Sequence, residues 1–152
     1  MTENTFIIIK PDAIKRGLME IIMERFQKIG DIKWIIGLYK NRDWCRMHYK
    51  HIKENPDLLN DYKIMEDFMT GTLLIGFLLG GEDIISNARE LAGSTRTWEA
   101  QAGTIRGEFC VPHAIVFPIC WNLVHVADSK QSVTREINLF KNRSLDYDFN
   151  TH

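Results

Sequence analysis

The feature that most constrains the fold is a short run of large apolar residues near the start of the chain. The segment from Phe6 to Ile9 contains no polar residue, and it stops at Lys10-Pro11. Aromatic and β-branched residues in such a run are typical of a strand buried on both faces, and proline stops a strand because it has no N–H to donate. The run therefore predicts a buried strand with Lys10 at its end.

The rest of the chain alternates between helical and extended patterns. From Leu18 to Gly30, apolar residues recur at the spacing of one helix face. The predicted elements after that helix are a strand over 32–38, helices over 43–50 and 58–69, a strand over 73–79, a short helix over 82–91, a long loop over 93–118 and a strand over 121–126. A last helix follows, with Asp128 as its N-cap and Gln131 at the capping-box position. This order has no repeat and no composition shift, so it predicts one α+β domain over residues 1–152.

The composition is that of an ordinary globular protein without a charge bias. The chain has 152 residues, of which 45% are hydrophobic, and its 19 basic and 20 acidic side chains leave a formal net charge of -1. Such a balance gives no general attraction to nucleic acid or to an anionic membrane. Any site for an anion must therefore be local.

The cysteines and the N-terminal residues indicate where the protein works. Cys45, Cys110 and Cys120 are an odd number in a chain long enough to bury a core, which disfavours a disulfide framework. The first residues have neither the apolar length of a signal peptide nor that of a membrane span. The expected location is therefore the reducing cytoplasm.

Four cationic or titratable residues from separate segments could meet in such a fold. They are Lys10 after the first strand, Arg89 late in a helix, Arg106 in the long loop and His125 at the end of the last strand. The chain has no G-x-x-x-x-G-K-[ST] and no G-x-G-x-x-G pattern, so side chains would have to hold a phosphate. Arginine suits this task because its planar guanidinium can bind two phosphate oxygens at once. Taken singly, each is weak evidence, because a lone arginine on a helix is usually solvated and a lone histidine on a strand is more often structural.

Several segments resemble the signature segments of nucleoside diphosphate kinases. In chain order they are Thr5 to Gly17 (TFIIIKPDAIKRG), Arg89 to Gly93 (RELAG), Gly103 to Phe109 (GTIRGEF), Asn122 to Ser129 (NLVHVADS) and Arg135-Glu136-Ile137. The similarity extends from Thr5 to about Phe140.

The resemblance implies both a fold and a reaction. The fold would be a ferredoxin-like α+β sandwich, with a four-stranded antiparallel sheet, helices on its faces and an extended loop before the last strand. The γ-phosphate of a nucleoside triphosphate would pass to a nucleoside diphosphate in two steps, with ping-pong kinetics, through a phosphohistidine at His125. Mg²⁺ would arrive on the nucleotide phosphates, which leaves Asp128 only a contact through water. The family forms homo-oligomers, often hexamers or tetramers, so such an assembly is expected.

The same resemblance assigns the residues that would hold the nucleotide. Lys10 would bind the sugar hydroxyl and the transferring phosphate, and Asn122 would bind the sugar. Arg89, Thr95 and Arg106 would bind the phosphates. This division is chemically sound because phosphoryl transfer depends on positioning and on charge stabilisation.

The resemblance also implies which residues lie around the nucleophile and around the base. Tyr49 would lie beside His125, and Glu136 would accept a hydrogen bond from the ring nitrogen that does not attack. His125 must be neutral to attack, so the cations at the phosphates help by opposing its protonation. Leu58 would take the place beside the base that phenylalanine has in many members.

The chain departs from the usual family pattern close to the nucleophile. Val126 and Ala127 stand where the family usually has glycine and serine, and about six additional residues separate Arg106 from His125. Asn122 and His125 are three residues apart, and a regular strand would place them on opposite faces. We therefore expect a local distortion of the backbone between them.

Three other interpretations follow from the same residues. The chain could be a catalytically weakened member of the fold that binds nucleotides or protein partners, or a small RNA- or DNA-binding sandwich, which its net charge disfavours. Cys45-x-x-His48 and Cys110-x-x-His113 together could supply four zinc ligands. The ordinary interpretation of those pairs is preferred, because nothing in the sequence brings them together.

Overall fold

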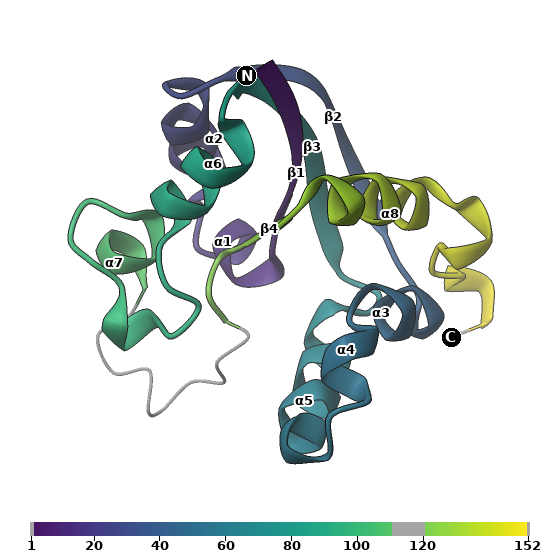
Figure 1. Cartoon of the computed structure of the whole chain (residues 1–152). Helices are drawn as coiled ribbons and strands as arrows, with labels where there is room; N and C mark the ends of the chain where they lie inside the picture. The colour runs from purple at the N-terminus through teal and green to yellow at the C-terminus, as the bar shows by residue number, and fades with distance from the viewer. Residues whose placement is uncertain (1, 111–120, 152) are drawn as a thin grey trace.

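A four-stranded antiparallel sheet lies at the centre of the computed structural model, which describes residues 2–110 and 121–151 (Figure 1). The strands are β1 (Thr2–Ile9), β2 (Asp31–Tyr39), β3 (Leu73–Glu82) and β4 (Val124–Val126), in the order β2-β3-β1-β4. All three neighbouring pairs are antiparallel. The predicted ferredoxin-like α+β class is confirmed.

Eight α-helices connect and cover these strands in the described part of the chain. They are α1 (Pro11–Lys15), α2 (Met19–Gln27), α3 (Arg42–His48), α4 (Lys50–Lys53), α5 (Leu59–Met69), α6 (Ile84–Ala92), α7 (Ile105–Phe109) and α8 (Lys130–Lys141). Short 3₁₀ turns, η1 (Pro56–Leu58), η2 (Thr97–Glu99), η3 (Arg143–Leu145) and η4 (Phe149–Thr151), complete the fold. No helix among these residues has the length and apolar character needed to cross a bilayer.

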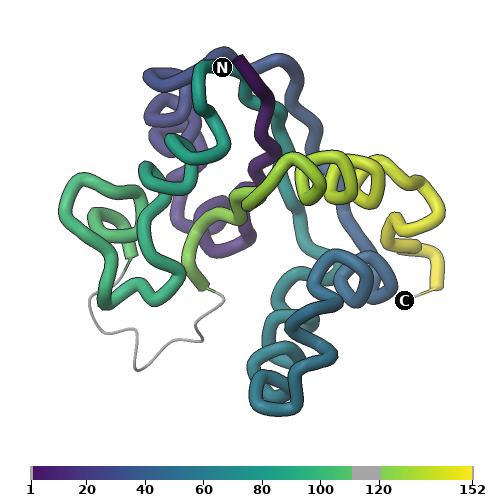
Figure 2. Tube along the Cα trace, in the orientation of Figure 1, coloured from purple at the N-terminus to yellow at the C-terminus, as the bar shows by residue number. Residues whose placement is uncertain are grey.

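Strand β1 joins two hydrophobic cores, one on each face of the sheet. Ile7 and Ile9 belong to a core completed by residues of α1, α2, α6 and α7, whereas Phe6 and Ile8 belong to a core completed by α3, α5 and α8. All four side chains are fully buried, and each such burial contributes roughly 1.5–3 kcal/mol. The trace in Figure 2 has α2 and α6 on one side of β1 and α8 on the other. The prediction of a strand buried on both faces is thus confirmed.

Two predicted helix starts are wrong, and each error has a local cause. The helix expected over 82–91 begins at Ile84, because β3 continues to Glu82 and pairs there with Thr2. The last helix is capped by Ser129, which accepts a hydrogen bond from the Ser132 N–H, and not by Asp128.

Other boundaries differ through proline and turn chemistry. Pro11 does end β1, but it also begins α1, because a proline at the first helical position needs no N–H partner. The helix expected over 43–50 is divided at Tyr49 into α3 and α4. The strand expected over 121–126 is present only as Val124–Val126. In the predicted loop over 93–118, residues 93–110 contain η2 and α7, and 111–118 lie outside the described residues.

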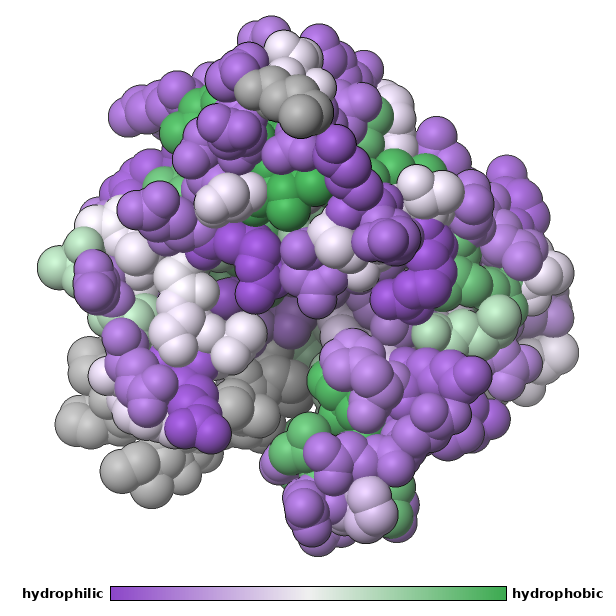
Figure 3. Space-filling model, viewed as in Figure 1, coloured by the Kyte–Doolittle hydropathy of each residue, from purple (hydrophilic) through white to green (hydrophobic). Residues whose placement is uncertain are grey.

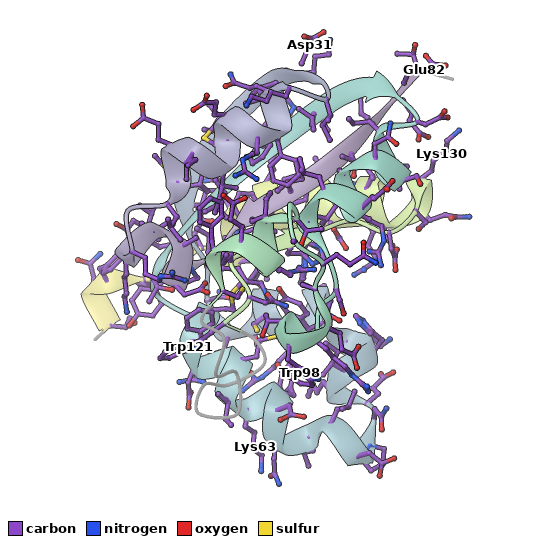
Figure 4. The ribbon with its side chains drawn as sticks, turned by 90° about the vertical axis from the view of Figure 1, so that its left-hand side faces the viewer. Asp31, Lys63, Glu82, Trp98, Trp121 and Lys130 are labelled. Atoms are coloured by element: carbon purple, nitrogen blue, oxygen red, sulfur yellow. The ribbon has the colours of Figure 1, made fainter. Side chains whose placement is uncertain are left out.

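Residues 50–69, comprising α4, η1 and α5, form a helical hairpin that extends beyond the sheet. Figure 4 shows this: Lys63 on α5 lies at the opposite end of the molecule from Asp31 and Glu82 at the far ends of β2 and β3. Neither α4 nor η1 contains a buried residue. The hairpin therefore reaches the sheet mainly through the buried face of α5.

Candidate active site

The backbone leaves its extended path at Leu123, immediately before β4. Leu123 has a φ of 76°, in the region that favours glycine, and the Val124 N–H donates to the Asn122 carbonyl at 2.9 Å. A hydrogen bond across two residues with positive φ makes a γ-turn, which costs about 1–3 kcal/mol in strain. The expected distortion between Asn122 and His125 is confirmed, and both residues line the same cavity.

The segment that follows β1 holds this turn on one side. The buried Asp12 carboxylate accepts a hydrogen bond from the Leu123 N–H at 3.1 Å, and the Leu123 carbonyl accepts one from the Lys10 N–H at 2.9 Å. Burial raises the pKa of the Asp12 carboxyl, while the Lys10 charge and backbone N–H groups act against that rise. Sequence reasoning did not single out Asp12, although it lies in the resembling segment two residues after Lys10.

Arg106 of α7 holds the turn on the other side. Its guanidinium donates to the carbonyls of Asn122 at 3.0 Å, Gly93 at 2.7 Å and Val124 at 2.6 Å. The residue is 6% exposed, and burial, followed by the nearby Arg89 charge, lowers the pKa of Arg106 to about 10. It therefore stays cationic at neutral pH, and two of its five N–H groups remain for a ligand in the cavity.

Lys10 and Asn122 are joined where β1 ends. The Lys10 Nζ donates to the Asn122 Oδ1 at 2.8 Å, and both residues are about 5% exposed. The Asn122 amide in turn donates to the Thr95 carbonyl at 3.5 Å. Lys10 and Asn122, two of the predicted nucleotide-binding residues, thus form a buried hydrogen-bonded pair beside the backbone of Thr95, a third predicted residue.

His125, on β4, faces Glu136 on α8. Its Nε2 lies 2.8 Å from a Glu136 carboxylate oxygen, and the histidine side chain is 19% exposed while that of the glutamate is 5% exposed. This geometry fits a neutral imidazole whose proton sits on Nε2 and donates to the carboxylate, which leaves a lone pair on Nδ1. Burial raises the pKa of Glu136, and Arg135 at 3.7 Å opposes that rise.

The environment keeps His125 neutral. Burial first, and then the charges of Lys10 and Arg106, lower the pKa of His125 to about 3. Glu136 favours the protonated ring, but it is a single buried carboxylate against several cations. At neutral pH the imidazole therefore has an available lone pair.

These groups line a cavity of about 760 Å³ that lies between the sheet edge and the helical hairpin. Figure 3 shows a recess on this side of the molecule. All of the predicted site residues line it: Lys10, Tyr49, Leu58, Arg89, Thr95, Arg106, Asn122, His125, Asp128 and Glu136. Arg89 and Thr95 are exposed in it, and the Tyr49 ring lies 6.0 Å from the His125 ring.

The comparisons with known proteins agree with this geometry. The family model described as nucleoside diphosphate kinase matches residues 3–144. A nucleoside diphosphate kinase of Pyrococcus horikoshii is 39% identical over 142 residues, which are 91% of this chain and 85% of that protein. One from Streptococcus agalactiae is 36% identical, over 92% of this chain and 99% of that one. The chain belongs to the nucleoside diphosphate kinase family.

Solved structures of this family have the same fold. The nucleoside diphosphate kinase of Encephalitozoon cuniculi superposes with a TM-score of 0.81 at 30% identity, covering 98% of this chain and 97% of that one. That of Halobacterium salinarum in complex with CDP gives 0.81 at 26% identity, covering 98% and 93%. As a nucleoside diphosphate kinase, the chain transfers phosphate from a nucleoside triphosphate to a nucleoside diphosphate. The weakened-member alternative and the RNA- or DNA-binding alternative are not favoured.

Val126 and Ala127, which follow the histidine, both join the backbone of β1. Val126 pairs with Ile7 of β1, and the Ala127 N–H donates to the Phe6 carbonyl at 3.0 Å. Ala127 is fully buried and carries no hydroxyl. The carboxylate of Glu136 therefore positions His125 without a hydroxyl from residue 127.

The two cysteine–histidine pairs weighed as zinc ligands do not form a site among the described residues, in agreement with the preferred interpretation. Cys45 is fully buried, and burial raises the pKa of its thiol to about 12, which disfavours the thiolate that zinc needs. His113 lies outside the described residues. His48, by contrast, lies against His125, with 4.6 Å between the ring centres. Sequence reasoning had assigned His48 only to the cysteine pair.

Proposed function

We propose that His125 is the nucleophile of this kinase and that its Nδ1 attacks the γ-phosphorus of a nucleoside triphosphate. The observation that carries this proposal is the 2.8 Å contact between Nε2 and Glu136, which leaves Nδ1 for the attack. A bond forms between Nδ1 and phosphorus while the bond from phosphorus to the β–γ bridging oxygen breaks, and the diphosphate leaves. A β-phosphate oxygen of a second nucleotide then attacks the same phosphorus and restores His125, which gives ping-pong kinetics.

The cationic residues of the cavity would stabilise the charge that develops on the phosphoryl oxygens. Arg89 and Thr95 are exposed to the cavity, and Arg106 keeps two N–H groups for a phosphate. Lys10 would bind the phosphate and the sugar hydroxyl, and Asn122, its partner at 2.8 Å, would bind the sugar. Fixed cations in a buried site cost little reorganisation during the reaction, so they accelerate it.

Mg²⁺ would enter with the nucleoside triphosphate as part of the substrate. Oxygen ligands suit this ion, and the nucleotide phosphates supply most of them. Asp128 lines the cavity, and hydrogen bonding from Ser132 lowers the pKa of its carboxyl, so it is ionised at neutral pH. It could accept a hydrogen bond from a water on the ion.

The nucleoside would extend toward the helical hairpin. Leu58 lines that end of the cavity and is 37% exposed, which supports an apolar contact with the base. The Halobacterium salinarum relative is a complex with CDP, and a nucleotide in this chain would occupy the cavity described here. Tyr49 would lie beside the phosphorylated ring.

Three broader proposals go with this function. Residues 1–152 would form a single domain, because the first strand lies between strands from the middle and the end of the chain. The enzyme would be a cytoplasmic homo-oligomer, a hexamer or a tetramer, and light scattering at assay concentration measures that state. Free cysteines at positions 45 and 110 agree with a reducing location.

The test is to incubate the protein with γ-labelled nucleoside triphosphate and Mg²⁺ and then to isolate the protein. We expect an acid-labile, base-stable phosphoenzyme that loses its label when a nucleoside diphosphate is added. His125→Gln should abolish the label and lower turnover by at least about 10⁴-fold, since the covalent step is lost. Lys53→Gln, on the exposed α4 and outside the cavity lining, is the control. Equal labelling of His125→Gln would place the nucleophile elsewhere.

A further inference from the structure

His48 is a buried histidine that the phosphoryl transfer does not use. It is 1% exposed, and neither of its ring nitrogens has a hydrogen-bond partner among the described residues. A buried polar atom without a partner costs about 1–3 kcal/mol. Burial, followed by the His125 charge, lowers the pKa of His48 well below its usual range, so the ring is neutral and has a lone pair to donate.

His48 lies beside two other groups that bind metals. One ligand atom each from His48, His125 and Glu136 lies within 4.8 Å of the others, and they are the one such group of three among the described residues. The rings of His48 and His125 meet edge to face, with 4.6 Å between their centres and 75° between their planes. Two imidazoles and one glutamate are a ligand set that binds zinc with a fourth position left open.

We propose that His48, His125 and Glu136 form an inhibitory site for Zn²⁺ and chemically similar transition-metal ions. Tetrahedral bonds of about 2.0–2.2 Å hold neighbouring ligand atoms roughly 3.4 Å apart. The His48 nitrogen would therefore move toward the ion, while His125 Nε2 and Glu136, now 2.8 Å apart, would separate slightly, both by side-chain rotation. The ion would lie between the Nε2 of His125 and Glu136, where the 2.8 Å hydrogen bond now lies. Its open position would face the cavity that His125 and Glu136 line.

The inhibition follows from the single proton of a neutral imidazole. With the proton on Nε2, the Nδ1 of His125 has the lone pair that attacks phosphorus. A metal ion that takes the Nε2 lone pair moves this proton to Nδ1, and the nucleophilic lone pair is lost. No net proton is released from His125, and no other chemical change is needed. Metal binding therefore inhibits phosphoryl transfer because it changes the tautomer of His125.

The ligand set also determines which ions bind and how tightly. Imidazole nitrogen favours Zn²⁺, Cu²⁺, Ni²⁺ and Co²⁺ over Mg²⁺, so the substrate's Mg²⁺ does not compete for the site. Lys10, Arg89 and Arg106 face His125 and oppose a second dication, while Glu136 and Asp128 favour one. We therefore expect micromolar affinity, weaker than that of a structural zinc site.

The direct test is titration of the nucleotide-free protein with Zn²⁺ alone, followed by calorimetry, and with Co²⁺ alone, followed by visible absorption. We expect one ion per chain and the intense visible bands of four-coordinate Co²⁺. His48→Phe keeps a ring in the buried place without nitrogen, and it should weaken both ions by ~100-fold or more because one of three protein ligands is lost. Met47→Phe, at an exposed position of α3 that does not line the cavity, is the control and should bind as the wild type does.

The functional test follows formation of the labelled phosphoenzyme in excess Mg²⁺ with added Zn²⁺. Zn²⁺ should block labelling of the wild type, a chelator should restore it, and His48→Phe should need ~100-fold more Zn²⁺ relative to its own metal-free rate. Equal zinc affinity of His48→Phe and the wild type, or no cobalt bands, would refute the site. The inference rests on His125 as nucleophile only for the inhibition. Metal binding with the label on another residue would therefore refute the proposed function and not the site.

Discussion

The two walls of the cavity are built in opposite ways. At the sheet edge, Lys10, Arg106, Asn122 and Glu136 are each 4–6% exposed, and the carbonyls around them are occupied by hydrogen bonds. On the helical hairpin, α4 and η1 have no buried residue, and Leu58 is 37% exposed.

The difference matches what each end of a nucleotide requires. The phosphates are the same in every nucleoside triphosphate, so a fixed array of cations can serve all of them. Bases differ in shape and in hydrogen-bonding groups, and an exposed apolar contact accepts each of them. Under the proposed function, the buried residues at the sheet edge would fix the reaction, while the hairpin would tolerate variation in the base.

Of the substitutions at the sheet edge, Arg106→Ala should have the largest effect on activity and stability. Arg106→Ala removes a cation from the proposed phosphate site, so we expect kcat to fall by about 10²–10³-fold. It also removes the hydrogen bonds from Arg106 to the carbonyls of Gly93, Asn122 and Val124, which should lower the free energy of unfolding by about 2–5 kcal/mol. The Asn122 carbonyl keeps its bond from the Val124 N–H. Steady-state kinetics and denaturant unfolding measure the two effects. Arg89→Ala, whose side chain makes one carbonyl contact at 3.4 Å, should reduce kcat while stability stays nearly unchanged, and equal destabilisation would contradict this account.

Asp12 tests whether the γ-turn positions the site. Asp12→Ala removes the acceptor of the Leu123 N–H, so we expect the free energy of unfolding to fall by about 1–3 kcal/mol and kcat to fall by about tenfold. Asp12→Asn keeps an acceptor oxygen and should retain most of both quantities. If Asn and Ala were equally harmful, the carboxylate charge rather than the hydrogen bond would be responsible.

The buried histidines predict a pH dependence of stability. The pKa values of His48 and His125 lie below the ordinary 6.5, so between about pH 3 and 6.5 the unfolded chain binds more protons than the folded one. The free energy of unfolding should therefore rise with pH across this window, by up to about 1.4 kcal/mol per pH unit for each histidine. Urea unfolding from pH 4.5 to 7 should show a smaller slope for His48→Phe. The same slope for His48→Phe and His51→Phe would argue against this assignment.

The smallest effect is expected on the hairpin. Leu58→Phe should lower the KM for nucleotides by about three- to tenfold with kcat unchanged, because an aromatic ring stacks on any base. Leu59→Phe provides the matched control, since Leu59 is also exposed but does not line the cavity. A change in kcat rather than in KM would mean that the hairpin takes part in the chemistry.

The sequence predicted those features that depend on neighbouring residues. The apolar run ending at Ile9 identified the central strand, and the three-residue spacing of Asn122 and His125 required a distorted backbone. The positions of His125 and Glu136 followed from a family resemblance and not from spacing. Their 2.8 Å contact depends on how α8 crosses the sheet, which no local pattern specifies.

The features that were missed depend on contacts distant in sequence. Asp12 acquires its role from the N–H of Leu123, 111 residues later, and the proposed role of His48 depends on its ring contact with His125 of β4. The capping residue was misplaced by one position because Asp128 and Ser129 are both good caps, and the Ser132 N–H selects the serine.

The pairing of β4 with β1 also has a consequence for how the protein is made. The last strand joins the first through three residue pairs, and the Lys10–Asn122 bond spans 112 positions. During synthesis, Lys10 leaves the ribosome early, but its partner and Glu136 follow only near the end of the chain. The buried wall therefore cannot assemble on a nascent chain shorter than about α8. A partly made protein of this kind would have no working nucleophile.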